Sequence, residues 1–188
     1  MNGQYHYAVV GAGRQGVAAA YDMAKWGDAA SILLADANYS AASQAAERIA
    51  QLTGHPNVSA AQVDVLDHNA LVECLKPVDV FLCGTPFRMI PLCMQAAVEA
   101  QTSMVDLGGH TDTVLRQLAM HDAVAAAGVT VVPDCGMGPG MNNTLGVYAV
   151  EQLQGAARPR VRCGFGMAVC RRIRPNPGAI SVRSTSTA

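Results

Sequence analysis

Short apolar runs alternate along the chain with longer stretches in which alanine recurs at helical spacing. The apolar runs predict strands near Tyr5–Val10, Ser31–Ala35, Val58–Val63, Val78–Leu82, Ser103–Asp106 and Val129–Val132. The stretches between them predict helices near Arg14–Trp26, Tyr39–Leu52, Asn69–Leu75, Arg88–Ala100 and Thr111–Ala127. Several of the strands are apolar almost throughout, as strands covered on both faces must be. The alternation therefore predicts an α/β fold with one open, doubly wound parallel sheet.

The rhythm changes after Val132, where the glycine-rich turn Pro133–Gly140 cannot form regular structure. A helix is predicted near Met141–Gln152, and Arg160–Cys163 reads as the first strand of a second, α+β domain. No usable periodicity follows Gly164. The prediction is thus a first domain at 1–132, a linker turn, helix and incomplete substrate or dimerisation domain at 133–163, and an irregular tail at 164–188.

A glycine motif, Gly11-Ala12-Gly13-Arg14-Gln15-Gly16, lies between the first strand and the first helix. In this context Gly11 permits a tight turn, Gly13 lets the backbone approach a pyrophosphate, and Gly16 lets the helix pack against the strand. The helix that begins at Arg14 and Gln15 presents unpaired N–H groups to the phosphates. The motif predicts a dinucleotide site on a Rossmann-type fold.

Asp36 ends the second strand, and it follows Gly16 at the spacing where an acidic side chain meets the adenosine ribose. A carboxylate there accepts hydrogen bonds from the ribose hydroxyls and repels a 2′-phosphate. Residues 37–46 contain no Arg or Lys that could attract that phosphate. Asp36 therefore favours NAD over NADP, although it could instead cap the helix at Tyr39.

Two later strand ends are further candidates for the cofactor site. Asp64 follows the third strand and could contact the adenine amino group, or could belong to a surface turn. Gly84-Thr85-Pro86 follows the fourth strand, where the chain would pass the nicotinamide ribose and pyrophosphate. A plain strand-ending turn is the alternative for that segment.

The composition favours a small-molecule partner. The 188 residues are 51% hydrophobic and 14% charged, with a formal net charge of -1, which gives no field to gather nucleic acid or a membrane surface. The N-terminal residues show no secretory signal, no apolar stretch is long enough to cross a membrane, and a cytoplasmic location is expected. The six cysteines form no CxxC pair, so we expect reduced thiols and no metal site.

Three segments together carry a resemblance to a known family. They are Gly11–Gly16 followed by Tyr21-Asp22-Met23-Ala24, then Val105–Gly109, then Pro133–Asn143. With these segments the chain resembles the saccharopine dehydrogenase-like family, and within it most closely the lysine 6-dehydrogenases. The likeness extends over roughly residues 5–163, and Pro133–Gly140 is its most specific part.

The resemblance implies an NAD-dependent oxidoreductase that acts on the carbon–nitrogen bond of a lysine-like amino acid. It would place the turn that includes Cys135 and Gly136 beside the nicotinamide, although a structural interdomain turn is the alternative. Asp106 could bind a substrate ammonium or a water, or cap the helix at Thr111. His110 could act as an acid or base, although most loop histidines are only solvated. Hydride transfer needs no nucleophile, so none is assigned to Cys135.

Family members continue into a sizeable second domain that commonly pairs subunits, which implies a homodimer for a full-length form. Permissible codons for residues 168–188, read in a shifted frame, can encode a strand like the one that opens that domain. We therefore hypothesise a frameshift near residues 164–168, against the alternative of a genuine short protein. Two rival functions remain: an NADP-linked imine reductase of the saccharopine or carboxynorspermidine type, and a non-catalytic nucleotide-binding module.

Overall fold

The computed structural model describes residues 4–154 of the chain. They divide into a first unit that ends at Cys135 and a second unit that begins at Gly136, inside the predicted glycine-rich turn. The predicted strand Arg160–Cys163, the tail and the proposed frameshift lie outside the described residues.

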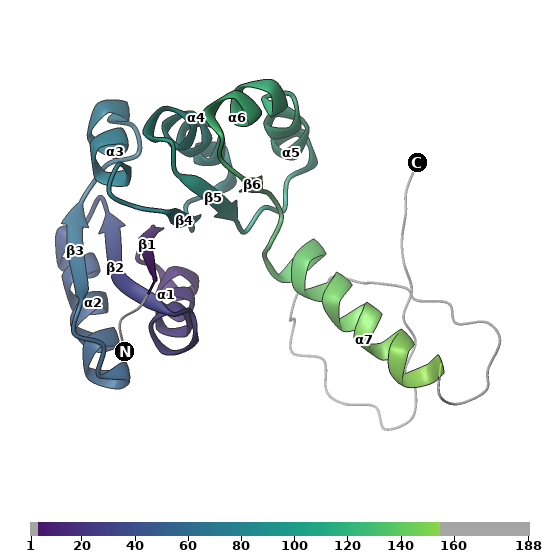
Figure 1. Ribbon diagram of the computed structural model, residues 1–188, viewed down its shortest axis with the longest axis horizontal. Helices are drawn as coiled ribbons and strands as arrows, with labels where there is room; N and C mark the ends of the chain where they lie inside the picture. The colour runs from purple at the N-terminus through teal and green to yellow at the C-terminus, as the bar shows by residue number, and fades with distance from the viewer. Residues whose placement is uncertain (1–3, 155–188) are drawn as a thin grey trace, which may run out of the picture. The chain divides into compact units, whose positions relative to one another are not determined.

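A parallel sheet forms the centre of the first unit (Figure 1). Its strands follow the order β3-β2-β1-β4-β5-β6, which is that of a Rossmann fold, and all neighbours pair in parallel. The sequence prediction of a doubly wound α/β fold is thereby confirmed. The strands are β1 (Tyr5–Val10), β2 (Ala29–Asp36), β3 (Val58–Gln62), β4 (Val80–Cys83), β5 (Ser103–Asp106) and β6 (Val131–Val132).

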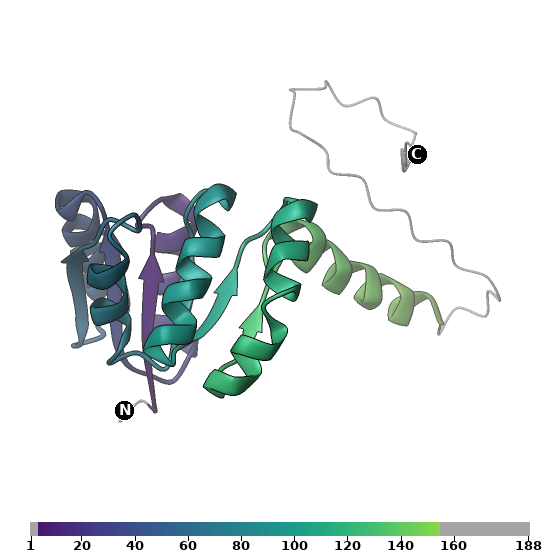
Figure 2. The ribbon, with the colours of Figure 1, turned by 90° about the horizontal axis from the view of Figure 1, so that it is seen from above.

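Helices cover both faces of this sheet (Figures 1 and 2). Along β1, Val9 packs into a cluster with Ala20 and Ile49 of the helices on one face, while its neighbours Ala8 and Val10 pack into the cluster on the other. This alternation is why β1 is apolar at consecutive positions. The helices are α1 (Arg14–Trp26) and α2 (Tyr39–Thr53) on one face, and α3 (His68–Leu75), α4 (Ile90–Ala100), α5 (Thr111–Leu118) and α6 (His121–Ala127) on the other.

Side chains fix the points at which several helices begin. The Asn38 Oδ1 accepts a hydrogen bond from the Ala41 N–H at 3.3 Å at the start of α2. Asp67 does the same for the Ala70 N–H at 3.0 Å at the start of α3. These caps satisfy N–H groups that the first helical turn leaves without intrahelical partners.

The prediction of a single helix at Thr111–Ala127 is wrong, because the structure has two helices there, α5 and α6. Met120, with φ −90° and ψ 9°, leaves the helical conformation at the break, and its N–H donates to the Gln117 carbonyl oxygen at 3.0 Å. Both α5 and α6 contact α4, and the break allows each to take its own direction across that helix. Alanine-rich periodicity alone does not record such a bend.

The second unit contains a helical turn, η2 (Met137–Met141), and then α7 (Asn142–Gln154). Gly138 interrupts η2 with extended backbone at φ −144° and ψ 123°. The helix α7 occupies the stretch where a helix was predicted at Met141–Gln152.

Candidate functional site

The glycine loop, residues 11–16, lies at the carboxyl end of β1, between the ends of β2 and β4. The strand order reverses at β1, and nucleotides bind at such switch points in doubly wound sheets. The Gly11 N–H donates to the Ala35 carbonyl oxygen at 2.7 Å, and the Gly84 N–H donates to the Val10 carbonyl oxygen at 2.8 Å. The loop is therefore tied to both neighbouring strands.

Two glycines of the loop are required by the fold itself. Gly11 has φ +103°, and a Cβ on it would lie 2.9 Å from the Gly84 carbonyl oxygen. A Cβ on Gly16 would overlap the Gly11 carbonyl oxygen. Since backbone atoms of a packed sheet cannot move aside, any other residue at Gly11 or Gly16 would displace the loop.

Gly13 differs from Gly11 and Gly16, because the direction in which a Cβ would project from it is free of other atoms. Its extended backbone, φ −73° and ψ −177°, is accessible to any residue, and a Cβ there would meet no heavy atom within 4 Å. Gly13 is the N-cap of α1, and the cap has no side-chain hydrogen bond. Arg14 and Gln15 begin the helix and are exposed. The open backbone and the uncapped helix start fit a pyrophosphate.

Asp36 lies at the end of β2 with its carboxylate against the glycine loop. Its Oδ2 accepts a hydrogen bond from the Ala12 N–H at 2.8 Å, and its Oδ1 accepts one from the Asn38 N–H at 2.9 Å. The alternative that Asp36 caps α2 is wrong, since Asn38 is the capping residue. The structure thus places the Asp36 carboxylate beside the loop, and its contact with the adenosine ribose stays a prediction.

A groove of about 580 Å³ begins at Ala12 and Gly13 and runs between α1 and α2. Arg14 and Arg48 line it, and neither forms an ion pair within residues 4–154. Arg48 lies on α2, just beyond the ten residues after Asp36 in which the sequence prediction looked for a cation. Helical folding brings it back toward the loop, and the sequence prediction missed it.

Asp64 follows β3 and is exposed. Its Oδ1 accepts a hydrogen bond from the Leu66 N–H at 3.0 Å, and its carbonyl oxygen accepts one from the Asp67 N–H at 2.9 Å. These bonds form a turn that leads into α3. These bonds agree with the alternative that Asp64 belongs to a surface turn, and its contact with adenine stays a prediction.

The segment Gly84-Thr85-Pro86 leaves β4 beside the glycine loop. A Cβ on Gly84 would lie 3.3 Å from the carbonyl oxygens of both Gly11 and Val10. The Thr85 Oγ1 lies 3.2 Å from the Cys83 Sγ. The pKa of the nearby Cys93 thiol is raised by its own hydrogen bond with Cys83 and by burial. The Cys93 thiol is thus held protonated and packs in the core as a small apolar group.

Two segments of the family resemblance meet at the end of β5. Asp106 is fully buried, its Oδ2 accepts a hydrogen bond from the Gln117 Nε2 at 2.6 Å, and its Oδ1 accepts one from the Asp134 N–H at 3.1 Å. The Asp106 carbonyl oxygen accepts a hydrogen bond from the Cys135 N–H at 2.8 Å. We call these four residues the Asp106 clasp. Both carboxylate oxygens are engaged, which supports a structural role for Asp106.

Asp134 extends the clasp to the loop after β5. It has φ +60°, and its Oδ1 accepts a hydrogen bond from the Gly109 N–H at 2.8 Å. A Cβ on Gly108 would overlap that same carboxylate oxygen. The glycine pair Gly108-Gly109 and the aspartate at 134 are therefore two halves of one contact, which the sequence prediction did not identify.

His110, and not Asp106, caps α5. Its Nδ1 accepts a hydrogen bond from the Thr113 N–H at 3.4 Å and lies 3.1 Å from the Thr113 Oγ1. The His110 ring stacks on Phe87 with centroids 4.4 Å apart and 15° between the planes. With Nδ1 engaged by Thr113, Nε2 is the ring nitrogen left for other partners.

A small cavity, which we call the α4–α5 cavity, lies around this stacked pair. Its volume is about 160 Å³. Its lining comes from the short helical turn η1 (Phe87–Met89), from the start of α4, and from α5 with its N-cap His110. The lining residues are Phe87, Arg88, Pro91, His110, Asp112, Thr113 and Arg116.

Cys135 is exposed at the end of the first unit. Desolvation and the Asp106 and Asp134 carboxylates raise the pKa of its thiol. The reactive thiolate is therefore disfavoured, which agrees with assigning no nucleophile to Cys135. Gly136 begins the second unit, so its contact with a cofactor stays a prediction.

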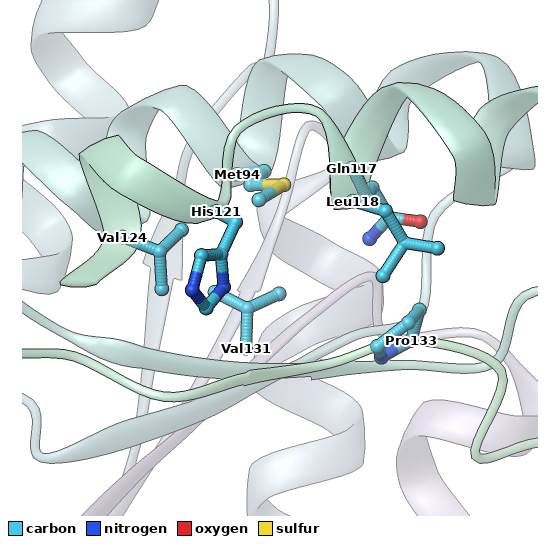
Figure 3. A pocket seen from close by; sticks show the side chains of 7 residues that line it. All are labelled: Met94, Gln117, Leu118, His121, Val124, Val131 and Pro133. Carbon is cyan, nitrogen blue, oxygen red and sulfur yellow. The ribbon is translucent and has the colours of Figure 1, made fainter.

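A second cavity, of about 190 Å³, lies beneath α5 and α6 (Figure 3). Gln117 and Leu118 stand at one end of it and Val124 and His121 toward the other, with Val131 and Pro133 below. The Gln117 Oε1 is buried without a hydrogen-bond partner, because the Nε2 of the same amide is turned to Asp106. The cavity is largely apolar otherwise.

Within residues 4–154, no group of three His, Cys, Asp or Glu residues is arranged to hold a metal ion. None of the helices described there is long and apolar enough to cross a membrane. Cys74, Cys83, Cys93 and Cys135 are free thiols, and Cys163 and Cys170 lie outside the described residues.

Several solved structures of other proteins resemble this chain in fold. Saccharopine dehydrogenase (L-Glu forming) from Saccharomyces cerevisiae aligns with a TM-score of 0.63 and 22% identity, over 81% of this chain and 32% of that one. A putative myo-inositol dehydrogenase from Sinorhizobium meliloti 1021 aligns with a TM-score of 0.55 and 16% identity, over 80% and 42% of the two chains. A short-chain type dehydrogenase/reductase from Mycobacterium marinum gives a TM-score of 0.57 and 15% identity, over 70% and 74%. At these identities the likeness shows the fold.

Sequence comparison identifies the family. Saccharopine dehydrogenase (NADP(+), L-glutamate-forming) from Saccharomyces cerevisiae (strain ATCC 204508 / S288c) is 26% identical over 111 residues, which cover 59% of this chain. The match spans 24% of that relative, so this chain corresponds to about a quarter of its length. The family model of the saccharopine dehydrogenase NADP binding domain matches residues 7–132, more than half of the chain. By that match, and in agreement with its strand order and glycine loop, the chain belongs to the saccharopine dehydrogenase NADP binding domain family.

Proposed function

We propose that residues 4–135 bind NAD as the nucleotide domain of an oxidoreductase that acts on the carbon–nitrogen bond of a lysine-like amino acid. The observation that carries the proposal is the Asp36 carboxylate, which lies against the glycine loop and accepts the Ala12 N–H at 2.8 Å. Family membership supports an oxidoreductase with a nicotinamide cofactor. The choice of NAD rests on Asp36.

Each part of the cofactor has residues suited to hold it. The open backbone at Gly13 and the first N–H groups of α1 suit the pyrophosphate. Asp36 suits the ribose hydroxyls of the adenosine. Gly84-Thr85-Pro86 lies at the carboxyl end of β4, the neighbour of β1 in the sheet, and suits the nicotinamide ribose and pyrophosphate. A bound nicotinamide supplies the two-electron acceptor for the carbon that bears the amine.

Of the two candidates for proton transfer, the structure favours His110. Asp106 is buried with both oxygens hydrogen-bonded, which supports a positioning role in the clasp. His110 is exposed at the same edge of the sheet, and its capping bond through Nδ1 leaves Nε2 for exchange with a substrate or water. We assign no nucleophile, since the thiol pKa of Cys135 is raised.

An NADP-linked enzyme of the saccharopine type is the second candidate. The family description and the yeast relative both name NADP. The groove beside the loop adds a physical reason, because Arg14 and Arg48 line it without carboxylate partners within residues 4–154. Guanidinium groups bind phosphate well, so the two cations could receive a 2′-phosphate in spite of Asp36.

Titration calorimetry with NADH and NADPH separates the two cofactors. If the protein prefers NAD, NADH should bind more tightly than NADPH. Asp36→Ala should then lower the affinity for NADH at least tenfold, because losing about 1.4 kcal/mol of charged hydrogen bonding corresponds to a factor of ten. The difference between the NADH and NADPH affinities should shrink accordingly. Asp22→Ala, which removes an exposed carboxylate from α1, is the matched control and should change neither affinity. Tighter binding of NADPH, lost in Arg14→Gln or Arg48→Gln, would establish the second candidate.

Resequencing the gene from codon 160 onward determines whether the reading frame continues into a second domain. An assay of the restored protein then tests the activity. An open shifted frame would restore a second domain, and the restored protein should oxidise lysine with NAD. A clean stop with no coding sequence after it would instead favour a non-catalytic nucleotide-binding module. The cytoplasmic location and the homodimer expected of a full-length form remain predictions.

A further inference from the structure

We propose that the α4–α5 cavity binds the carboxylate of the amino acid substrate, with Arg88 and Arg116 as its cationic groups. The proposal rests on the proposed function for the identity of the ligand. Its physical basis is the position, charge and rigidity of the cavity.

The cavity lies where two cofactor-edge loops end. Gly84-Thr85-Pro86 leads directly from β4 into Phe87, and Leu107–Gly109 leads directly from β5 into His110. The register pairs Cys83 with Asp106, so both loops leave the sheet at its carboxyl edge. The glycine loop leaves β1 at that same edge, since Val10 pairs with Cys83. A ligand in the cavity would therefore lie on the cofactor side of the sheet.

The charge of the lining favours a monoanion. Arg88 and Arg116 are exposed, and neither has a carboxylate within 4.0 Å among residues 4–154. Asp112 also lines the cavity, so the three side chains carry +2 and -1, which leaves a net charge of +1. A carboxylate neutralises that charge, whereas a phosphate dianion would leave the cavity with a net charge of -1.

The walls of the cavity are held in place. The His110 ring is fixed by its bonds to Thr113 and by stacking on Phe87 at 4.4 Å. The Arg88 guanidinium carbon lies 5.5 Å from the centre of the Phe87 ring, which orients this side chain. A cavity of about 160 Å³ is smaller than the usual 300–1,000 Å³ of a whole-ligand site, and it suits one end of an amino acid.

NMR titration of the purified 188-residue chain with L-lysine, lysinamide and inorganic phosphate tests the assignment. Lysinamide keeps both amines and lacks only the carboxylate. We expect L-lysine to shift the side-chain Nε signals of Arg88 and Arg116 in a saturable manner, with lysinamide and phosphate at least tenfold weaker. Equal binding of L-lysine and lysinamide, or stronger binding of phosphate, would overturn the proposal.

Variants add an independent measurement. Arg88→Gln with Arg116→Gln should weaken L-lysine binding at least tenfold, while Lys25→Gln, which removes an exposed cation from α1 on the other face of the sheet, should leave it unchanged. Asp112→Asn should strengthen L-lysine binding severalfold, an effect that a purely structural role would not produce. Circular dichroism verifies folding, and if the double variant unfolds, Arg116→Gln alone serves.

A parallel NADH titration keeps the two proposals apart. Binding of NADH without binding of L-lysine would refute the cavity assignment alone. Binding of L-lysine without NADH would refute the proposed function and leave the carboxylate site standing. An unchanged L-lysine affinity in Arg88→Gln with Arg116→Gln would also refute the assignment.

Discussion

Replacing Gly13 by valine should remove nucleotide binding while leaving the fold nearly intact. The missing Cβ of Gly13 faces open space and its backbone is accessible to any residue. The expected stability cost is that of a poorer N-cap, about 1 kcal/mol, which corresponds to a fall in Tm of roughly 3 °C for a domain of this size. A side chain on the open side, however, lies where the pyrophosphate must approach.

The expected loss of affinity follows from the hydrogen bonds that the phosphates can no longer make. Losing two charge-assisted bonds from the first turn of α1, at about 1.5 kcal/mol each, weakens NADH by roughly 150-fold. Gly16→Ala is the contrasting variant, because its Cβ would overlap the Gly11 carbonyl oxygen. It should lose about 3 kcal/mol or more of unfolding free energy through steric strain.

Fluorescence titration with NADH and urea unfolding followed by circular dichroism measure the two effects separately. The reasoning requires Gly13→Val to be folded and unable to bind, and Gly16→Ala to be destabilised. An NADH affinity for Gly13→Val within threefold of the parent would show that the phosphates do not approach this backbone. A Gly16→Ala variant as stable as the parent would show that the contact between α1 and β1 is looser than the structure indicates.

Two further predictions concern the Asp106 clasp. Asp106→Asn should change the unfolding free energy by no more than about 1 kcal/mol, because the Gln117 amide can turn its unpartnered Oε1 toward the new amide. Asp106→Leu should lower the unfolding free energy by about 3 kcal/mol, because it leaves the Asp134 N–H and the Gln117 amide without partners. Equal losses in urea unfolding would mean that the carboxylate charge, and not its hydrogen bonding, holds the clasp. Since its raised pKa leaves less thiolate at pH 8, Cys135 should react with iodoacetamide more slowly than N-acetylcysteinamide, and Asp134→Asn should accelerate the reaction. Peptide mapping by mass spectrometry measures the rate, and a Cys135 that reacts faster than N-acetylcysteinamide would refute the raised pKa.

The sequence alone was sufficient to predict the parallel sheet and the glycine loop, because both depend on local patterns. Apolar strands separated by helical stretches leave few topologies, and right-handed crossovers select among them. The spacing from Gly16 to Asp36 likewise selected Asp36 for the ribose, and the hydrogen bond from the Ala12 N–H shows that its carboxylate lies beside the loop, while the ribose contact stays a prediction. These features are encoded within single βα units.

Tertiary structure decided what depends on contacts between distant segments. The clasp joins Asp106 to Asp134 across 28 positions, and that separation carries no periodic signal. The same holds for Phe87 and His110, which stack because β4 and β5 are neighbours in the sheet. Asp106 was a catalytic candidate in the sequence because it ends a strand at the cofactor edge, and its burial with both carboxylate oxygens hydrogen-bonded supports a structural role. A linear pattern records which residues can reach an edge of the sheet, but packing determines which of them remain open to a ligand.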